Sequence, residues 1–194
     1  MPLGSDLESA FRVAGLAWLA IFILWAVLRF TTKKTVDSSS DVRARLSVWG
    51  VLLAWFLLFL GIPDSRLAIR LLPMDPAIAY LGLALTLLGL GFAAWARLTI
   101  GSNWGDMITL QQDHELVRKG PYGIVRHPIY SGFMLATLGT AIIRGDLGGL
   151  VSVALIVICW GYKARLEESF MIQQFGAEYE DYRRKVKGLI PGVW

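Results

Sequence analysis

Residues 76–96, PAIAYLGLALTLLGLGFAAWA, decide the fold because they contain 21 positions without a charged side chain. A transmembrane α-helix needs about 20 consecutive apolar residues, so this stretch is long enough to cross a bilayer. Four further charge-free apolar stretches occupy residues 13–28, 46–63, 128–143 and 147–162. The sequence therefore predicts an all-α polytopic membrane protein with five transmembrane helices.

The overall composition agrees with a membrane location. Hydrophobic side chains make up 55% of the 194 residues, and the mean hydropathy is +0.54, which is too apolar for an ordinary soluble domain of this length. A soluble helical bundle is the alternative, but one small domain offers too little interior for five such helices. Three stretches hold only 16 residues. We expect long basic side chains at their ends to reach the headgroups, namely those of Arg12, Arg29, Arg144 and Lys163.

The distribution of basic residues predicts the orientation. Of the 19 Lys and Arg residues, 15 lie in residues 29–45, 97–126 and 163–187. The other four are Arg12, Arg66, Arg70 and Arg144. Because Lys and Arg gather in cytoplasmic loops, we expect the N-terminus outside and the C-terminus in the cytoplasm. The net charge of +4 then indicates topology and attraction to anionic membrane lipids, and no nucleic-acid partner is expected.

The apolar stretches divide the chain into two parts. Residues 1–96 hold the first three predicted helices and a polar connector at 31–45, while residues 97–194 form the candidate catalytic half. That half begins with a glycine-punctuated loop at 97–127 and ends with an amphipathic helical tail. Loops of this length are usually functional or disordered, and the apolar side chains of this one need burial. We therefore expect an ordered cytoplasmic layer that binds a cofactor.

Two features inside the predicted spans are interpreted as packing. The run GLGFAA at residues 89–94 is similar to a dinucleotide fingerprint, but it lies within a predicted helix without a preceding strand. We expect its small residues, Gly89 and Gly91 among them, to pack helix against helix. The single cysteine, Cys159, lies in the middle of the last span, where core packing is the expected role.

The sequence RHPIYSG at residues 126–132 is the first candidate site. Pro128 suits the first turn of a helix, which places Arg126 and His127 at the positive end of that helix. Such an arrangement attracts a carboxylate or phosphate. The aromatic face of Tyr130 favours a cation such as a sulfonium. A basic and aromatic belt at the membrane interface is the alternative interpretation.

Two adjacent acids form the second candidate site. Glu167 and Glu168 lie about one turn beyond the last predicted span, where unpaired carboxylates are costly. Their expected partners are Arg126 and His127, or the amine and hydroxyl groups of a ligand. A purely structural salt bridge is the alternative.

These motifs, in this order, resemble the isoprenylcysteine carboxyl methyltransferase (ICMT) family, integral-membrane enzymes that methyl-esterify a prenylated C-terminal cysteine. The resemblance covers residues 97–191. It rests on HELV at 114–117, GPY at 120–122, RHPIYSG at 126–132, the Glu pair at 167–168 and FG at 175–176. The resemblance implies S-adenosylmethionine as methyl donor, S-adenosylhomocysteine as product, a prenylated or lipid-like acceptor, and no metal.

Carried over position by position, the resemblance also implies roles for single residues. Cofactor binding is implied for His114, Glu115, Leu116, Val117, Tyr122, His127, Pro128, Ile129, Tyr130 and Glu167. The family has an arginine for the acceptor carboxylate where this chain has Lys163, and Arg165 is the alternative. Arg126 and Glu167 are the candidate catalytic residues. Lys163 and Arg126 are the candidate substrate-binding residues.

The expected function is therefore an S-adenosylmethionine-dependent O-methyltransferase of the protein-S-isoprenylcysteine type, in a prokaryotic cell membrane and with its active site on the cytoplasmic side. A carboxylate acceptor is already ionised at neutral pH, so no strong general base is required. Three alternatives remain: a phospholipid N-methyltransferase, a sterol-reductase-like membrane enzyme that uses NADPH, and a non-catalytic protein that binds lipid.

Overall fold

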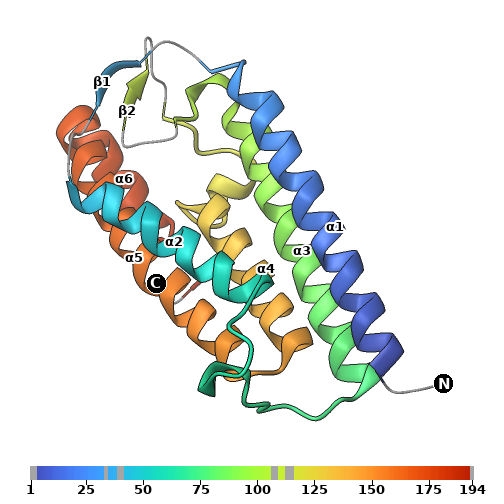
Figure 1. Cartoon of the computed structure of the whole chain (residues 1–194). Helices are drawn as coiled ribbons and strands as arrows, with labels where there is room; N and C mark the ends of the chain where they lie inside the picture. The colour runs from blue at the N-terminus through green and yellow to red at the C-terminus, as the bar shows by residue number, and fades with distance from the viewer. Residues whose placement is uncertain (1–3, 33–34, 39–41, 106–108, 112–115, 193–194) are drawn as a thin grey trace.

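The computed structural model places five long helices side by side, with short elements covering one end (Figure 1). It describes residues 4–32, 35–38, 42–105, 109–111 and 116–192. The helices are α1 (Gly4–Arg29), α2 (Val42–Phe59), α3 (Pro76–Ile100), α4 (Pro128–Arg144), α5 (Leu147–Phe175) and α6 (Ala177–Lys185). Three single 3₁₀ turns connect them: η1 (Arg66–Ala68), η2 (Gly101–Asn103) and η3 (Gly120–Gly123).

The helix boundaries follow from capping residues. The Asp75 carboxylate accepts a hydrogen bond from Ala77 N at 2.7 Å, and Pro76 occupies the first turn of α3. Asp146 caps α5 in the same way, by accepting from Gly149 N at 2.8 Å. Helix α5 ends at Gly176, whose φ of 52° lies in the region that favours glycine. Local sequence therefore sets where these helices begin and end.

All five predicted apolar stretches form helices, and the prediction of a helical membrane fold is confirmed at that level. Three segments are long and apolar enough to cross a membrane: Ser5–Arg29, Pro76–Asn103 and Leu147–Phe175. Helices α2 and α4 are shorter, with 18 and 17 residues.

A two-stranded sheet departs from the all-α prediction. Strand β1 (Thr35–Ser38) pairs antiparallel with β2 (Thr109–Gln111), with Asp37 opposite Leu110. Each strand lies in a connector, one after α1 and the other after α3, and both connectors leave the same end of the bundle (Figure 1). Pairing satisfies backbone groups that neither connector satisfies alone. Strands this short have too little alternation to be predicted from sequence.

One expected side-chain role is wrong. Arg144 does not extend toward headgroups, because its guanidinium donates to Leu57 O at 2.9 Å, to Leu58 O at 2.7 Å and to the Asp146 carboxylate. It thus satisfies carbonyls at the C-terminal end of α2. Lys163 is also enclosed, with only 8% of its surface exposed. Both basic groups have partners within the bundle. Such contacts between helices cannot be predicted from one apolar stretch at a time.

Helices α3 and α4 touch through their backbones. A Cβ atom added at Gly89 would lie 2.5 Å from Gly132 O, and one added at Gly139 would lie 2.4 Å from Gly82 O. Such contact between small residues is a common way to join membrane helices. The packing role predicted for Gly89 is therefore confirmed. Gly91 takes no part in it, because nothing lies within 4 Å of a Cβ added there.

We expect Gly89→Ala to destabilise the protein by about 1–3 kcal/mol, the usual range for overpacking a close contact. Gly91→Ala is the matched control, because its methyl group meets no neighbour and alanine favours the helix. Thermal unfolding in detergent measures both variants. Equal melting temperatures for the two would contradict backbone contact between α3 and α4.

Candidate functional site

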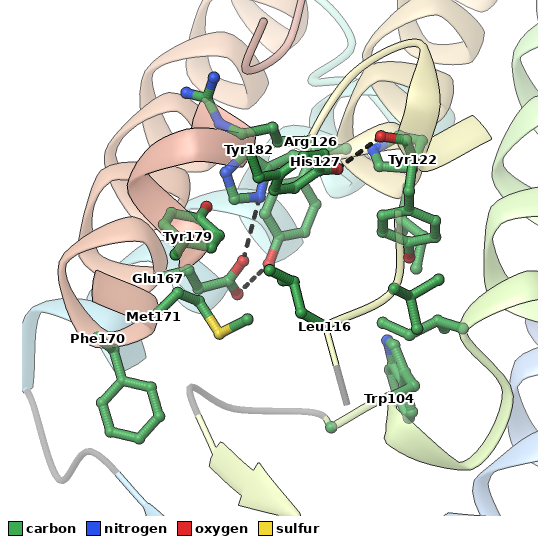
Figure 2. Close-up of a pocket in the computed structure, with 16 residues that line it drawn as sticks. Trp104, Leu116, Tyr122, Arg126, His127, Glu167, Phe170, Met171, Tyr179 and Tyr182 are labelled. Atoms are coloured by element: carbon green, nitrogen blue, oxygen red, sulfur yellow. Dashed lines mark hydrogen bonds and ion pairs between the residues drawn. The ribbon is translucent and has the colours of Figure 1, made fainter. Parts of the chain in front are cut away.

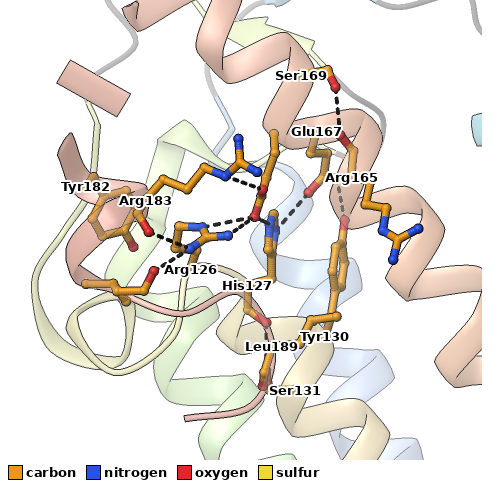
Figure 3. Close-up of polar contacts among 12 residues, drawn as sticks. Arg126, His127, Tyr130, Ser131, Arg165, Glu167, Ser169, Tyr182, Arg183 and Leu189 are labelled. Carbon is orange, nitrogen blue, oxygen red and sulfur yellow. Dashed lines mark hydrogen bonds and ion pairs between the residues drawn. The ribbon is translucent and has the colours of Figure 1, made fainter. Parts of the chain in front are cut away.

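The RHPIYSG block is held by two parts of the chain. Pro128 begins α4, as predicted, so Arg126 and His127 come just before its first turn. Their backbone N–H groups donate to Lys187 O at 2.8 Å and to Gly188 O at 3.0 Å. Ser131 Oγ donates to Leu189 O at 2.6 Å. The segment after α6, residues 186–190, therefore holds the block through hydrogen bonds to its backbone and to Ser131 (Figure 3).

The Glu168 carboxylate binds basic side chains. It accepts from Arg126 Nη2 at 2.5 Å and lies 3.2 Å from His127 Nε2 and 3.4 Å from Arg183 Nε. The other terminal nitrogen of this guanidinium group, Arg126 Nη1, donates to the carbonyl of Val186. Figure 3 shows Arg126, His127 and Arg183 side by side at these contacts. Arg126 thus connects α5 to the segment after α6.

The Glu167 carboxylate faces the other side of the histidine. His127 Nδ1 lies 3.4 Å from Glu167 Oε2, and Lys163 Nζ lies 3.9 Å from Glu167 Oε1. The Tyr130 hydroxyl donates to the same carboxylate. The structure thereby brings together Lys163, His127, Tyr130 and Glu167, which the sequence had placed in three separate motifs.

The two ring nitrogens of His127 both face carboxylates, which favours the charged form of the ring. Burial alone would lower its pKa, but the hydrogen bonds that the ring makes to Glu167 and Glu168 outweigh burial, so the pKa of His127 lies above its ordinary 6.5. A neutral ring would direct one lone pair at a carboxylate. The protonated imidazolium satisfies both acids at once.

This raised pKa predicts a dependence of stability on pH. The stabilisation is fully present below about pH 6.5 and is lost as the pH rises through the raised value. We expect the melting temperature of the wild type to fall over that alkaline range. His127→Gln should melt lower at about pH 6 and show a shallower fall. Parallel melting curves for the two proteins between about pH 6 and 9 would contradict a charged His127.

An open cavity of about 880 Å³ lies against these residues (Figure 2). Eight of the predicted cofactor-binding residues line it: Leu116, Val117, Tyr122, His127, Pro128, Ile129, Tyr130 and Glu167. Arg126 also lines this first cavity. The remaining two predictions, His114 and Glu115, lie outside the residues that the structure describes.

Sequence reasoning missed several residues of the first cavity, among them Phe170, Met171, Tyr179 and Tyr182. A usable signal existed for two of them, because positions three and four after Glu167 share its helix face. Burial raises the pKa of Tyr182 to about 12, and it also raises the pKa of Tyr179. Both phenols therefore remain protonated at neutral pH and can act as donors. The Tyr182 hydroxyl already donates to Tyr122 O at 2.6 Å.

A second cavity of about 850 Å³ lies between α1, α2, α4 and α5. Its walls are largely aromatic, with Trp25, Trp55, Phe133 and Trp160 among them. Among the described residues that line it, Lys163 is the one charged side chain. Arg126 and Arg165 do not line this cavity. An anionic group on an otherwise apolar molecule matches such a lining.

The two cavities meet at the start of α4. Ile129 and Tyr130 line both of them, together with Trp104 and Gly105. The Tyr130 ring stacks on His127, with centroids 5.7 Å apart, and on Trp160, with centroids 5.5 Å apart. The site therefore consists of a first cavity that contains the charged groups of Arg126, His127 and Glu167 and a second, largely aromatic cavity, with a common boundary. Among the described residues, no group of three or more His, Cys, Asp or Glu side chains is arranged to hold a metal ion.

Comparisons with known proteins identify the family of this chain and several relatives. The profile of a family described as phospholipid methyltransferase matches residues 77–178. A solved structure of the eukaryotic intramembrane Ras methyltransferase ICMT is 27% identical and has a TM-score of 0.53. The match covers 81% of this chain and 55% of that one.

Curated relatives of this chain are also named as isoprenylcysteine methyltransferases. A probable protein-S-isoprenylcysteine O-methyltransferase of Oryza sativa subsp. indica is 32% identical over 121 residues, which are 60% of this chain and 62% of the relative. The corresponding enzyme of Schizosaccharomyces pombe is 35% identical over 102 residues, 50% of this chain and 42% of the relative. The chain thus spans less than two thirds of their length. The resemblance to ICMT enzymes that the motifs predicted is confirmed.

Proposed function

Because this chain belongs to the phospholipid methyltransferase family, we propose that it transfers a methyl group from S-adenosylmethionine to the carboxylate of a prenylated or similar lipid-like acceptor. One observation carries the choice of acceptor. The second cavity is lined by aromatic side chains and a single charge, Lys163, among its described residues. The names of the curated relatives, which are protein-S-isoprenylcysteine O-methyltransferases, support the same choice.

The first cavity fits the methyl donor. Glu167, with 23% of its side chain exposed, offers carboxylate oxygens for hydroxyl or amine groups of the donor. Tyr122, Phe170 and Met171 supply apolar and aromatic surface for a nucleoside. The bound donor supplies a methyl group carried on a sulfonium. We assign Glu167 and His127 to holding the donor, and the other predicted lining residues to shaping its cavity.

The second cavity fits an anionic acceptor with an apolar tail. The Lys163 ammonium attracts a carboxylate and repels the protonated amine of a phospholipid headgroup. In the transfer, a carboxylate oxygen forms a bond to the methyl carbon with its own electron pair. The bond between that carbon and sulfur breaks, and sulfur keeps the electron pair of the broken bond. No proton moves, because the carboxylate is already ionised.

The chain's own residues align and desolvate the acceptor. Lys163 Nζ lies 5.6 Å from the centroid of the Tyr130 ring, which belongs to both cavities. A carboxylate held by Lys163 is therefore at the boundary where donor and acceptor must meet. Aromatic walls exclude water from that place, which strengthens the electrostatic contacts there.

Arg126 is given a different role from the one expected. Its guanidinium pairs with Glu168 and donates to the carbonyl of Val186. Arg126 lines the first cavity but not the second. We assign it to positioning Glu168 and the segment after α6. Lys163 then holds the acceptor without Arg126.

We further infer five spans, with the N-terminus outside and the site on the cytoplasmic side. The basic segments at 29–45, 97–126 and 163–187 support this orientation. With 17 and 18 residues, α4 and α2 are at the short end of the range for spanning helices. Membrane lipids then surround the bundle and present the acceptor. Location in a prokaryotic cell membrane stays a prediction.

Turnover with two acceptors tests the proposed function. The protein is purified in detergent and supplied with methyl-labelled S-adenosylmethionine and either a farnesylcysteine analogue or phosphatidylethanolamine. We expect a base-labile methyl ester on the prenylcysteine only. The family description favours the phospholipid as second candidate. Labelling of phosphatidylethanolamine alone would establish it, and absence of S-adenosylhomocysteine binding by calorimetry would exclude both.

A further inference from the structure

Four residues form the boundary between the two cavities: Trp104, Gly105, Ile129 and Tyr130. Reacting atoms must approach within about 3–3.5 Å for an in-line displacement. Under the proposed function, the methyl group therefore crosses from donor to acceptor beside these four residues. Any side chain that narrows or widens this boundary controls which acceptors react.

The two sides of the boundary differ in construction. Ile129 and Tyr130 lie in the first turn of α4, and Tyr130 is held by the Glu167 carboxylate and by two ring stacks. Trp104 and Gly105 follow η2 and belong to no helix or strand. Because Gly105 has no side chain, Trp104 supplies the large side chain at the boundary on the α3 side, among the residues that the structure describes. Figure 2 shows it across the first cavity from Phe170 and Met171.

A buried arginine holds the Trp104 ring. Arg97 is fully buried, and its guanidinium carbon lies 4.4 Å from the centroid of the Trp104 ring. Arg97 Nη2 donates to Leu28 O at 2.7 Å, and Nη1 donates to Gly101 O at 2.8 Å. These carbonyls lie at the C-terminal ends of α1 and α3, where the helix dipoles favour a cation. The ring is thus attached to the ends of two helices although its own segment is irregular.

We propose that Trp104 is a specificity-determining wall between the two cavities, and that Arg97 is the positioning residue that holds this wall. The proposal rests on the proposed function, because it assigns a use to the boundary that methyl transfer requires. The indole ring limits the size of the acceptor group that lies next to the carboxylate, and it aligns that carboxylate with the methyl group. A guanidinium fork is needed because one ammonium does not match both carbonyl directions and the ring face.

The experiment compares acceptors of graded size. Wild type, Trp104→Phe and Trp104→Leu are supplied with farnesylcysteine analogues whose N-acyl group grows from acetyl to benzoyl. Wild type should strongly prefer the acetyl analogue. We expect Trp104→Leu to lose about tenfold of that preference and about tenfold of kcat on the acetyl analogue. Trp104→Phe should be intermediate, and because it keeps an aromatic ring against the first cavity, its S-adenosylhomocysteine affinity should stay within about threefold of wild type.

Two further variants separate a specificity role from general damage. Trp95→Leu is the matched control, because Trp95 is 49% exposed on α3 and lines neither cavity. It should keep the wild-type preference. Arg97→Lys should reproduce the loss of preference seen in Trp104→Leu, with the donor affinity retained.

The outcomes keep the two proposals distinct. If wild type shows no transfer to any prenylcysteine analogue, both the proposed function and this inference are overturned. If wild type is active and both Trp104 variants keep its acceptor preference, only the inference is overturned. Loss of S-adenosylhomocysteine affinity in Trp104→Phe without a change in preference also overturns it, because the ring would then serve the donor.

Discussion

Glu167→Gln should weaken the binding of S-adenosylhomocysteine by about 10- to 150-fold and should lower turnover at least as much. The substitution keeps the size of the side chain but removes the charge that His127, Tyr130 and Lys163 share. A hydrogen bond to a charged group contributes about 1.5–3 kcal/mol, and the donor loses that contact when the carboxylate is replaced. About 1.4 kcal/mol corresponds to a factor of ten in affinity. Calorimetry with S-adenosylhomocysteine measures the first effect, and initial rates measure the second.

Glu178→Gln provides the matched control for this substitution. Glu178 also pairs with a basic side chain, that of Arg118, at 2.5 Å, but 58% of the Glu178 side chain is exposed. Exposed pairs contribute about 0–1 kcal/mol. The control should therefore bind S-adenosylhomocysteine as wild type does. If Glu167→Gln binds it equally well, Glu167 is not the residue that holds the donor.

The second large effect is expected for Lys163→Met. Methionine keeps an unbranched side chain in the second cavity but removes its charge, so the acceptor carboxylate loses its partner. A charge-assisted contact of this kind contributes about 1.5–3 kcal/mol, so we expect kcat/KM for the prenylcysteine analogue to fall about 10- to 150-fold. Donor affinity should change much less, because Glu167 keeps its contacts with His127 and Tyr130.

Two further variants test whether the loss in Lys163→Met depends on the charge of the side chain and on its position. Lys163→Arg restores a cation at the position where ICMT enzymes are expected to have arginine, and it should recover most of the activity. Arg165→Met removes a charge only two residues away, from a side chain that is exposed and lines neither cavity. It should leave kcat/KM unchanged. Equal losses in Lys163→Met and Arg165→Met would show that general charge near the membrane, not a specific contact, is responsible.

The parts of this site that sequence predicted are those whose geometry is local. Pro128 sets the start of α4 and thereby places His127 before its first turn. Glu167 and Glu168 follow each other on α5, so they reach opposite sides of a single imidazole ring. The hydrophobic runs also predicted the long helices, because a helix that crosses a membrane needs about 20 consecutive apolar residues.

The parts that sequence did not predict depend on contacts between distant segments. Trp104 lines both cavities because Arg97 and the end of α1 hold its ring, and no local pattern encodes that contact. Arg126 looked available for an acceptor, but the segment after α6 supplies a carbonyl that occupies it. Arg144 was expected at headgroups and instead binds the end of α2. The carbonyl partners of Arg97, Arg126 and Arg144 each lie tens of residues away along the chain.

The backbone contacts between residues 126–127 and 187–188 also bear on when the site forms during synthesis. Chains are made from the N-terminus at about 5–20 residues per second, and earlier segments fold first. All five long helices are therefore complete before the ribosome has released the residues that fix Arg126 and His127. A nascent chain at that stage has its bundle but lacks the contacts that hold the RHPIYSG block. Under the proposed function, we expect methyl transfer only after residue 189, whose carbonyl accepts the Ser131 hydroxyl, has been made.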